Sequence, residues 1–365
     1  MPLGDPATTV RRDRTRHLPR LLVSTVLMAL VVTLVPATSG AAPVPAADRT
    51  ADRTPARGPA TGGTAYLPGD LPGEPAGSGQ RGGASREEVD PRSLDYPRMP
   101  QRCATFRQKV PLTPTTCKIR WTNEKRPTVV LWGDSHAWQF LPAVRKAIQG
   151  KKVNLVAFIF GGCVPAKPDM RIWRGQPCAE TSARAIKFLD GLAKRDRDVR
   201  VVMGAYWGAN LDQVYYYRNE GEKKTHADRR QYVLRYTVPL FTWLGKRDIR
   251  TDVLAMSPVV VPPNPDCQPG PTPYDCPIDR RISLYKEAYV DQWVRQRVRD
   301  LPAGARYLDY QSQLCDAAVC RPHQAWGVYT WFDHYHLSQT TTERMAGMFA
   351  PTVTKLLSRA KNRRR

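Results

Sequence analysis

The chain has 365 residues, enough for one large domain or two ordinary ones, and a hydrophobic fraction of 41% is compatible with a packed core. A formal net charge of +23 at pH 7 is extreme and requires a partner or habitat that tolerates a basic surface. These numbers exclude a chain too small to bury a core, but nucleic acid, anionic lipid and acidic wall polymer all remain possible partners.

The first forty residues have the order of a secretory signal. A basic stretch at 11–20 precedes an uncharged apolar run at 21–35, and small residues follow at 36–46. The apolar run is shorter than the roughly twenty residues of a spanning helix, so cleavage is the first expectation and an uncleaved anchor the alternative. Residues 1–40 therefore predict export, either secreted or at the extracytoplasmic face of the membrane. Nucleic acid is then not an expected partner.

Composition divides the rest of the chain into three parts. Residues 41–98 are rich in Pro, Gly, Ala, Arg and Asp and poor in aliphatic residues, which predicts a disordered linker. Residues 99–358 carry the strand and helix patterns of one folded domain, and residues 359–365 are expected to be a solvated basic tail.

The eight cysteines all lie beyond the signal. An even number in an exported chain favours disulfides, and pairing between sequence neighbours is the cheapest of many connectivities. Free core thiols are the alternative. The neighbour pairs are Cys103 with Cys117, Cys163 with Cys178, Cys267 with Cys276, and Cys315 with Cys320.

Strand and helix patterns alternate through the folded part. Strands are predicted at 128–132, 153–160, 199–205, 251–257 and 305–309, and helices at 138–149, 178–195, 226–245, 283–299 and 339–357. Continuous apolar strands separated by amphipathic helices predict a mostly parallel sheet covered on both faces, an α/β doubly wound fold. Ligands of such sheets bind beyond the carboxyl ends of the strands.

The first predicted strand ends in Gly133-Asp134-Ser135-His136, where such a site is expected. A serine hydroxyl needs a base to become a nucleophile, and imidazole is suited to that task near neutral pH. The alternative for Ser135 is to cap the following helix.

The motif Asp-His-Tyr-His offers that base two hundred residues later. Asp333 and His336 are three residues apart, a spacing at which a carboxylate and an imidazole on one turn face the same way. A carboxylate in this place holds the imidazole in one tautomer and stabilises the cation that forms. His334 and His336 could also be two metal ligands, but no third ligand lies nearby, so neither a metal nor another cofactor is expected.

Four blocks of the chain resemble the SGNH (GDSL-like) hydrolase superfamily, and within it the SGNH domain fused behind membrane acyltransferase-3 domains. They are GDSH at 133–136, GGCVP at 161–165, LDYQSQLCDAAVC at 308–320 and DHYHLS at 333–338. The resemblance implies a flavodoxin-like three-layer sandwich with Ser135 as nucleophile, His336 as base and Asp333 as the group that orients it. It also implies that the backbone N–H groups of Ser135 and Gly162 form the oxyanion hole.

The chain departs from the superfamily after its third predicted strand. Many members have an asparagine there in a Gly-x-Asn-Asp block, whereas this chain has Trp207 near that place and Asn210 beyond it. Either Asn210 reaches the site from a rearranged loop, or the third oxyanion donor is missing, which would suit a slower or transfer-biased enzyme. Asp134, His136 and Trp207 are the remaining pocket candidates. Asp134 is expected to bind loop backbone, and His136 either lines the pocket or packs.

The sequence thus predicts an exported serine esterase or O-acyltransferase that acts on acyl groups, O-acetyl above all, of cell-envelope glycans. An acyl-serine intermediate serves hydrolysis and transfer alike. The acyl group would come from the ester substrate, a soluble donor or a separate membrane acyl-donor protein. The alternative is a non-catalytic module whose basic surface binds anionic wall polymer; a redox role for the cysteines has little support from their spacing.

Overall fold

A computed structural model describes the chain over residues 94–104, 108–111, 113–211, 217–219, 222–224, 230–260, 276–284, 287–324 and 327–363. The predicted signal at 1–40, all of the predicted linker except 94–98, and Cys267 lie outside these residues. Within the described part, no helix has the length and apolar composition that crossing a bilayer requires.

The central sheet has six strands in the order β1-β3-β2-β4-β7-β9. The five strands from β3 to β9 run parallel, and β1 pairs with β3 antiparallel at the edge. Apart from β1, this is the flavodoxin-like order 2-1-3-4-5, so the predicted α/β doubly wound fold is confirmed. The strands are β1 (Cys117–Arg120), β2 (Thr128–Gly133), β3 (Asn154–Ile159), β4 (Val199–Gly204), β7 (Arg250–Leu254) and β9 (Arg306–Leu308).

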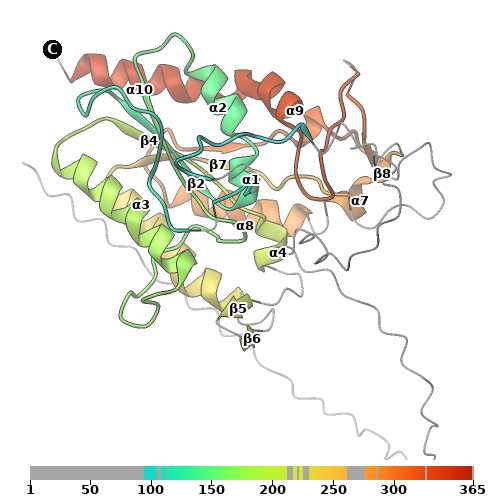
Figure 1. Ribbon diagram of the computed structural model, residues 1–365, viewed down its shortest axis with the longest axis horizontal. Helices are drawn as coiled ribbons and strands as arrows, with labels where there is room; N and C mark the ends of the chain where they lie inside the picture. Colours follow the sequence, from blue (N-terminus) through green and yellow to red (C-terminus); the bar gives the residue numbers. More distant parts are fainter. Residues whose placement is uncertain are drawn as a thin grey trace, which may run out of the picture. The chain divides into compact units, whose positions relative to one another are not determined.

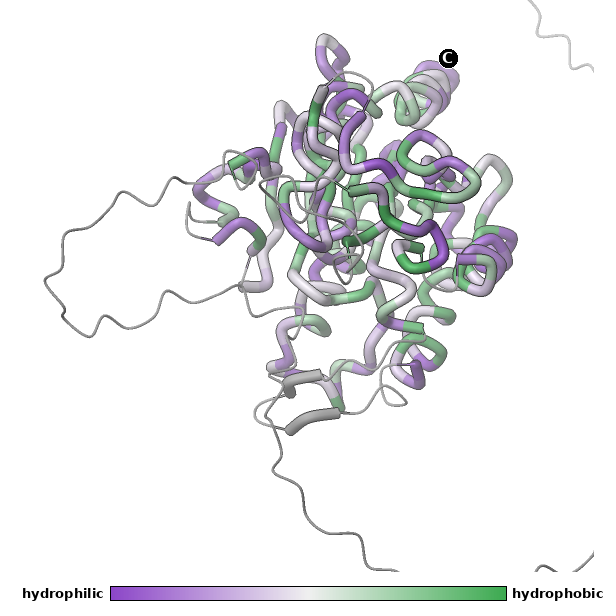
Figure 2. Tube along the Cα trace, turned by 90° about the vertical axis from the view of Figure 1, so that its right-hand side faces the viewer, coloured by the Kyte–Doolittle hydropathy of each residue, from purple (hydrophilic) through white to green (hydrophobic). Residues whose placement is uncertain are grey.

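Helices cover both faces of the sheet. In Figure 1, α2, α9 and α10 lie over one face, and α3 lies against the other. The longer helices α3, α6, α8 and α10 bury apolar residues on one side, and hydrophobic and hydrophilic stretches alternate along the chain in Figure 2. The helices are α1 (Ser135–Trp138), α2 (Leu141–Ala147), α3 (Pro177–Lys194), α4 (Trp207–Leu211), α6 (Val238–Lys246), α7 (Arg280–Ser283), α8 (Glu287–Arg299), α9 (Gln339–Arg344) and α10 (Ala350–Asn362).

Several elements differ from those expected. The helix predicted at 138–149 is shorter in the structure, where α2 spans Leu141–Ala147 and α1 ends at Trp138. The two helices are not continuous because Pro142, in the first turn of α2, has no N–H to continue a helix from α1. A short π-helix (Val233–Thr237) precedes α6, and a 3-10 helix (Met345–Phe349) separates α9 from α10. Two small antiparallel pairs, β5 (Tyr217–Asn219) with β6 (Glu222–Lys224) and β8 (Ile278–Asp279) with β10 (Val319–Cys320), were not predicted.

Residues 359–362, expected within a solvated basic tail, continue α10 to Asn362, and residues 361–363 are exposed to solvent. Arg359 hydrogen-bonds to Asp248 at the end of α6, and Arg363 to Asp196 at the end of α3. The helix extends further than its apolar pattern indicates because these two arginines find carboxylates at the ends of neighbouring helices.

A buried charge cluster joins the last strands to α10. Asp252 in β7 is fully buried and accepts hydrogen bonds from Arg200 in β4, Arg306 in β9 and Thr352 in α10. Burial acts to raise the pKa of Asp252, but the hydrogen bonds from the two guanidinium groups outweigh it and hold that pKa below its usual value. The carboxylate therefore stays charged and fully paired.

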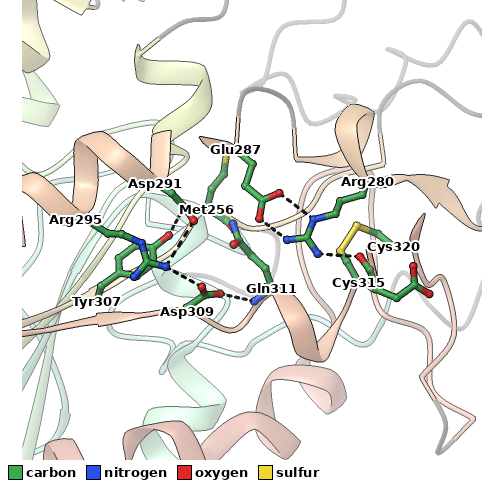
Figure 3. A network of polar contacts seen from close by, with 11 residues as sticks. Met256, Arg280, Glu287, Asp291, Arg295, Tyr307, Asp309, Gln311, Cys315 and Cys320 are labelled. Carbon is green, nitrogen blue, oxygen red and sulfur yellow. Dashed lines mark hydrogen bonds and ion pairs between the residues drawn. A yellow bond between two sulfur atoms is a disulfide. The ribbon is translucent and has the colours of Figure 1, made fainter. Parts of the chain in front are cut away.

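A second polar network fixes the segment between β9 and β10 (Figure 3). Asp309 accepts a hydrogen bond from Arg295 in α8 at 2.9 Å, and the Gln311 side chain donates to the carbonyl oxygen of Met256 at 3.1 Å. Further along, Arg280 hydrogen-bonds to Glu287 and donates to the carbonyl oxygen of Asp316 at 2.9 Å. The chain that follows β7 is thereby held against this segment.

Candidate active site

Ser135 is the first residue of α1, immediately beyond the carboxyl end of β2. The sheet order changes direction between β2 and β4, which is where doubly wound folds bind their ligands. Gly133 makes this turn possible, because a Cβ there would lie 1.8 Å from the carbonyl oxygen of Gly204 and 2.7 Å from the Cβ of Ala137. The ends of β2 and β4 can approach each other this closely only without that side chain.

Asp134 is buried and holds the backbone of two loops. One carboxylate oxygen accepts the N–H of His136 at 2.8 Å and thereby caps α1, and the other accepts the N–H of Tyr206 at 2.8 Å, beyond β4. Both contacts are to backbone, so Asp134 fixes where Ser135 emerges from the sheet.

Asp333 and His336 form a hydrogen-bonded pair. Both carboxylate oxygens of Asp333 lie 2.9 Å from the Nδ1 of His336, and Oδ1 also accepts the backbone N–H groups of Tyr335 and His336 at 2.8 and 2.7 Å. Burial acts to raise the pKa of Asp333, yet its electrostatic interaction with His336 and these hydrogen bonds hold that pKa below its usual value. A charged Asp333 beside Nδ1 keeps the proton on that nitrogen, which leaves Nε2 as the acceptor. Nε2 is buried and has no hydrogen-bond partner among the described residues.

Three contacts bring α1 alongside this imidazole. The ring of His336 lies 5.3 Å from the ring of His136 and 5.9 Å from that of Trp138, between centroids. The side chain of Gln139 accepts the N–H of Leu337 at 2.8 Å. These contacts place α1, which begins at Ser135, against the loop that carries His336. Ser135 is partly buried there.

His136 packs inside this arrangement as a neutral imidazole. Its ring stacks on Tyr206 at 4.4 Å and is almost fully buried. Burial lowers the pKa of His136 well below 6.5, and the nearby charge of His336 lowers it further, against a smaller opposite effect of Asp333. A neutral His136 does not compete with His336 for a positive charge.

Gly162 lies in the turn after β3 with φ +69°, and a side chain there would meet nothing within 4 Å. Within the described residues, no hydrogen bond uses the backbone N–H of Ser135 or of Gly162. Both donors are thus free for a ligand, as an oxyanion hole requires.

Asn210 and Trp207 are both buried, and the side chain of each donates to a backbone carbonyl oxygen. Asn210 is buried in α4, where its amide nitrogen donates to the carbonyl oxygen of Tyr206 at 2.8 Å. Trp207 is fully buried, donates to the carbonyl oxygen of Leu254 at 3.1 Å and packs 5.9 Å from Trp293. The indole therefore occupies the core beside β7.

The segment before β1 packs on the His336 loop from outside. Tyr96 lies 6.1 Å from Phe332, whose ring stacks on His336, and the ammonium of Lys109 lies 5.0 and 5.1 Å from the Tyr96 and Phe332 ring centroids. Asp95 accepts hydrogen bonds from the backbone N–H and the hydroxyl of Thr340. These residues precede the domain boundary expected at 99.

Three of the predicted cysteine pairs are disulfides, and Cys276 is also disulfide-bonded. Disulfides persist in oxidising compartments, so they indicate an extracytoplasmic location. Among the described residues, no group of three or more His, Cys, Asp or Glu side chains could hold a metal ion. The three described bonds join Cys103 to Cys117, Cys163 to Cys178, and Cys315 to Cys320.

Three solved structures resemble this chain at 12% sequence identity each. The periplasmic domain of a lipopolysaccharide acetyltransferase from Salmonella ser. Paratyphi A has a TM-score of 0.43 over 64% of this chain and 86% of that one. A protein from Slackia heliotrinireducens described as an SGNH hydrolase has a TM-score of 0.34 over 62% and 99%. A carbohydrate esterase family 2 enzyme with its carbohydrate-binding domain, from Corynascus thermopiles (Myceliophthora fergusii), has a TM-score of 0.33 over 66% and 69%.

Among curated proteins, no sequence match was found. The family of SGNH domains fused to AT3 domains matches residues 102–351, which is more than half of the chain and includes Ser135, Gly162, Asp333 and His336. This protein therefore belongs to the family of SGNH domains of the type fused to AT3 acyltransferase domains.

Proposed function

We propose that this protein is an exported serine esterase or O-acyltransferase that acts on acyl groups, O-acetyl above all, of cell-envelope glycans. One observation supports this most strongly. The imidazole of His336 is paired with Asp333 through Nδ1, and its unpartnered Nε2 belongs to the loop that packs on α1, the helix that Ser135 begins. Family membership supports the same chemistry.

In this proposal the Ser135 hydroxyl attacks the ester carbonyl while Nε2 of His336 takes its proton. The negative oxygen that forms accepts hydrogen bonds from the N–H groups of Ser135 and Gly162. The imidazolium then gives its proton to the departing alcohol, which leaves an acyl group on Ser135. Water or a sugar hydroxyl attacks the acyl group in the second half, with His336 again as base.

The family and the Salmonella domain suggest a glycan ester as substrate and a membrane protein as a possible acyl donor. Hydrolysis and transfer differ only in the acceptor of the acyl group. An acceptor sugar that shortens the lifetime of acyl-Ser135 and appears acylated in the product would identify a transferase.

The test uses p-nitrophenyl acetate and a fluorophosphonate probe on the purified protein. We expect labelling and turnover that are lost in Ser135→Ala and in His336→Ala, and an acyl mass on the peptide that contains Ser135. His334→Ala is the matched control, because His334 lies in the same loop but is exposed. Absence of labelling together with tight binding to anionic wall polymer would instead support a non-catalytic binding module.

A further inference from the structure

The side chain of Gln139 connects the serine helix to the histidine loop. Gln139 directly follows α1 and is fully buried. Its Oε1 accepts the backbone N–H of Leu337 at 2.8 Å, and its Nε2 donates to the hydroxyl of Ser257, beyond β7. Both ends of the amide are therefore used.

The protons of this chain of hydrogen bonds can be assigned. Tyr310 donates its hydroxyl proton to the carbonyl oxygen of Ala255 at 3.1 Å, so its oxygen accepts from Ser257 at 2.6 Å. Ser257 then accepts from the Gln139 nitrogen. This order fixes the orientation of the amide and turns its oxygen toward Leu337.

The hydrogen bond between Gln139 and Leu337 matters because each residue lies close in the chain to a residue of the proposed site. The N–H of Gln139 donates to the carbonyl oxygen of Ser135 at 3.0 Å, so the two residues are one helical turn apart. Leu337 directly follows His336. We propose that Gln139 is a positioning residue that sets the approach of His336 Nε2 to the Ser135 hydroxyl, an inference that rests on the proposed function.

Other hydrogen bonds hold the His336 loop to different parts of the fold. Val260 donates to the carbonyl oxygen of His334 at 2.7 Å, and the indole of Trp331 donates to that of Pro258 at 2.9 Å. Both attach the loop to the chain beyond β7. Within the described residues, the Gln139–Leu337 bond is the one hydrogen bond that joins residues 134–140 to residues 331–338. Without it, the loop and the Asp333–His336 pair persist, and the ring contacts of His336 with His136 and Trp138 remain between the loop and α1. Such packing is less directional than a hydrogen bond, so it holds the position of the imidazole less tightly.

The experiment compares Gln139→Leu, Gln139→Glu and the control Gln311→Leu. Gln311 is buried to a similar extent, and its side chain donates to the carbonyl oxygen of Met256, so it makes no direct hydrogen bond to the His336 loop. For Gln139→Leu we expect kcat with p-nitrophenyl acetate to fall about 10- to 100-fold with little change in KM, since small misplacements of reacting groups cost this much. Gln311→Leu should retain kcat.

Gln139→Glu tests whether the two hydrogen bonds of the Gln139 amide can be restored by a similar side chain. A protonated glutamic acid can donate to Ser257 and accept from Leu337, as the amide does, whereas the carboxylate cannot donate. The kcat of Gln139→Glu, divided by that of wild type at the same pH, should therefore rise as pH falls. Ionisations that the two proteins share largely cancel in the ratio, and burial raises the pKa of the Tyr310 hydroxyl, which therefore stays uncharged. A ratio that stays far below unity at every pH would contradict the assignment of the amide contacts.

Unchanged kcat in Gln139→Leu, or a loss no larger than in Gln311→Leu, would overturn the inference while leaving the proposed function intact. A wild-type protein that neither labels nor turns over would overturn the proposed function itself. In that case crystal structures of the wild type and of Gln139→Leu test the positioning role of Gln139. A wider separation between Ser135 Oγ and His336 Nε2 in Gln139→Leu supports positioning, and an unchanged one excludes it.

Discussion

Individual residues of the site differ in how visible they are in the sequence. The spacing of Asp333 and His336 predicts that the carboxylate reaches the imidazole, and the structure has that hydrogen bond. Gln139 was missed because its partners are a backbone N–H and a distant serine, neither of which has a sequence signature. The available signal was a lone polar residue in the apolar run 137–144, which on burial must find a partner.

Replacement of Asp333 by Asn tests the role of the carboxylate. Asn can still accept the backbone N–H groups of the turn, but its amide nitrogen would face Nδ1 and favour the tautomer with the proton on Nε2. We expect kcat to fall by about 10³- to 10⁴-fold with the thermal unfolding midpoint nearly kept. A variant that retains a tenth of the wild-type rate would exclude the proposed triad.

The low pKa of His136 predicts a loss of stability in acid. The unfolded chain binds a proton at His136 below about pH 6.5, whereas the folded protein binds it only at much lower pH, so the free energy of unfolding falls as pH decreases through this range. The slope attributable to His136 approaches about 1.4 kcal/mol per pH unit. Urea unfolding of wild type and His136→Gln at pH 8 and pH 5 measures it, and the variant should lose less stability. Equal losses would show that His136 is not held neutral.

At the scale of elements, the sequence predicts the parallel strands well because β2 and β3 are apolar runs and amphipathic helices follow them. In β4, β7 and β9 the apolar residues are interrupted by Arg200, Asp252 and Arg306, and both arginines pair with Asp252. It does not predict β1, β8 or β10, which are short and pair through tertiary contacts. The later start of α2, relative to the helix predicted at 138–149, also has a local cause in Pro142. It places Gln139 at the end of α1 rather than inside a helix.

The close approach of β2 and β4 gives a prediction for Gly133. In Gly133→Ala the new methyl group would collide with the backbone of Gly204, so one of the two strand ends must shift. We expect a loss of about 1–3 kcal/mol in the free energy of unfolding, as in other overpacked cores, and a slower reaction of Ser135 with fluorophosphonate. Gly347→Ala is the matched control, because a Cβ there meets nothing within 4 Å, and its stability should be unchanged or higher. Equal stabilities of the two variants would contradict the packing argument.

At the scale of the molecule, the sequence indicates one α/β domain behind an export signal, and the family match covers most of that domain. What the sequence does not reveal is where this domain begins. Tyr96 and Asp95 lie in a segment of linker-like composition, yet they pack on Phe332 and Thr340. Composition reports average hydrophobicity, whereas these contacts depend on two particular side chains.

The net charge predicts binding that is independent of catalysis. With a formal charge of +23, the protein should co-sediment with isolated anionic wall polymer at about 0.1 M salt and dissociate near 1 M, where the Debye length falls to about 3 Å. Ser135→Ala should bind as wild type does. Binding that resists 1 M salt, or that requires Ser135, would show recognition by the pocket instead of by overall charge.

The contacts of Asp95 and Tyr96 also determine where the protein can be shortened. A version starting at Met99, the boundary suggested by composition, would lack the carboxylate that holds Thr340 and the ring that covers Phe332, only four residues to either side of His336. Such a truncation would keep Ser135, Asp333 and His336 and the whole sheet, yet release the loop that carries His336. Recombinant versions should therefore start upstream of Leu94, and a protease that cuts between this residue and Met99 would loosen the His336 loop without cutting the sheet or its helices.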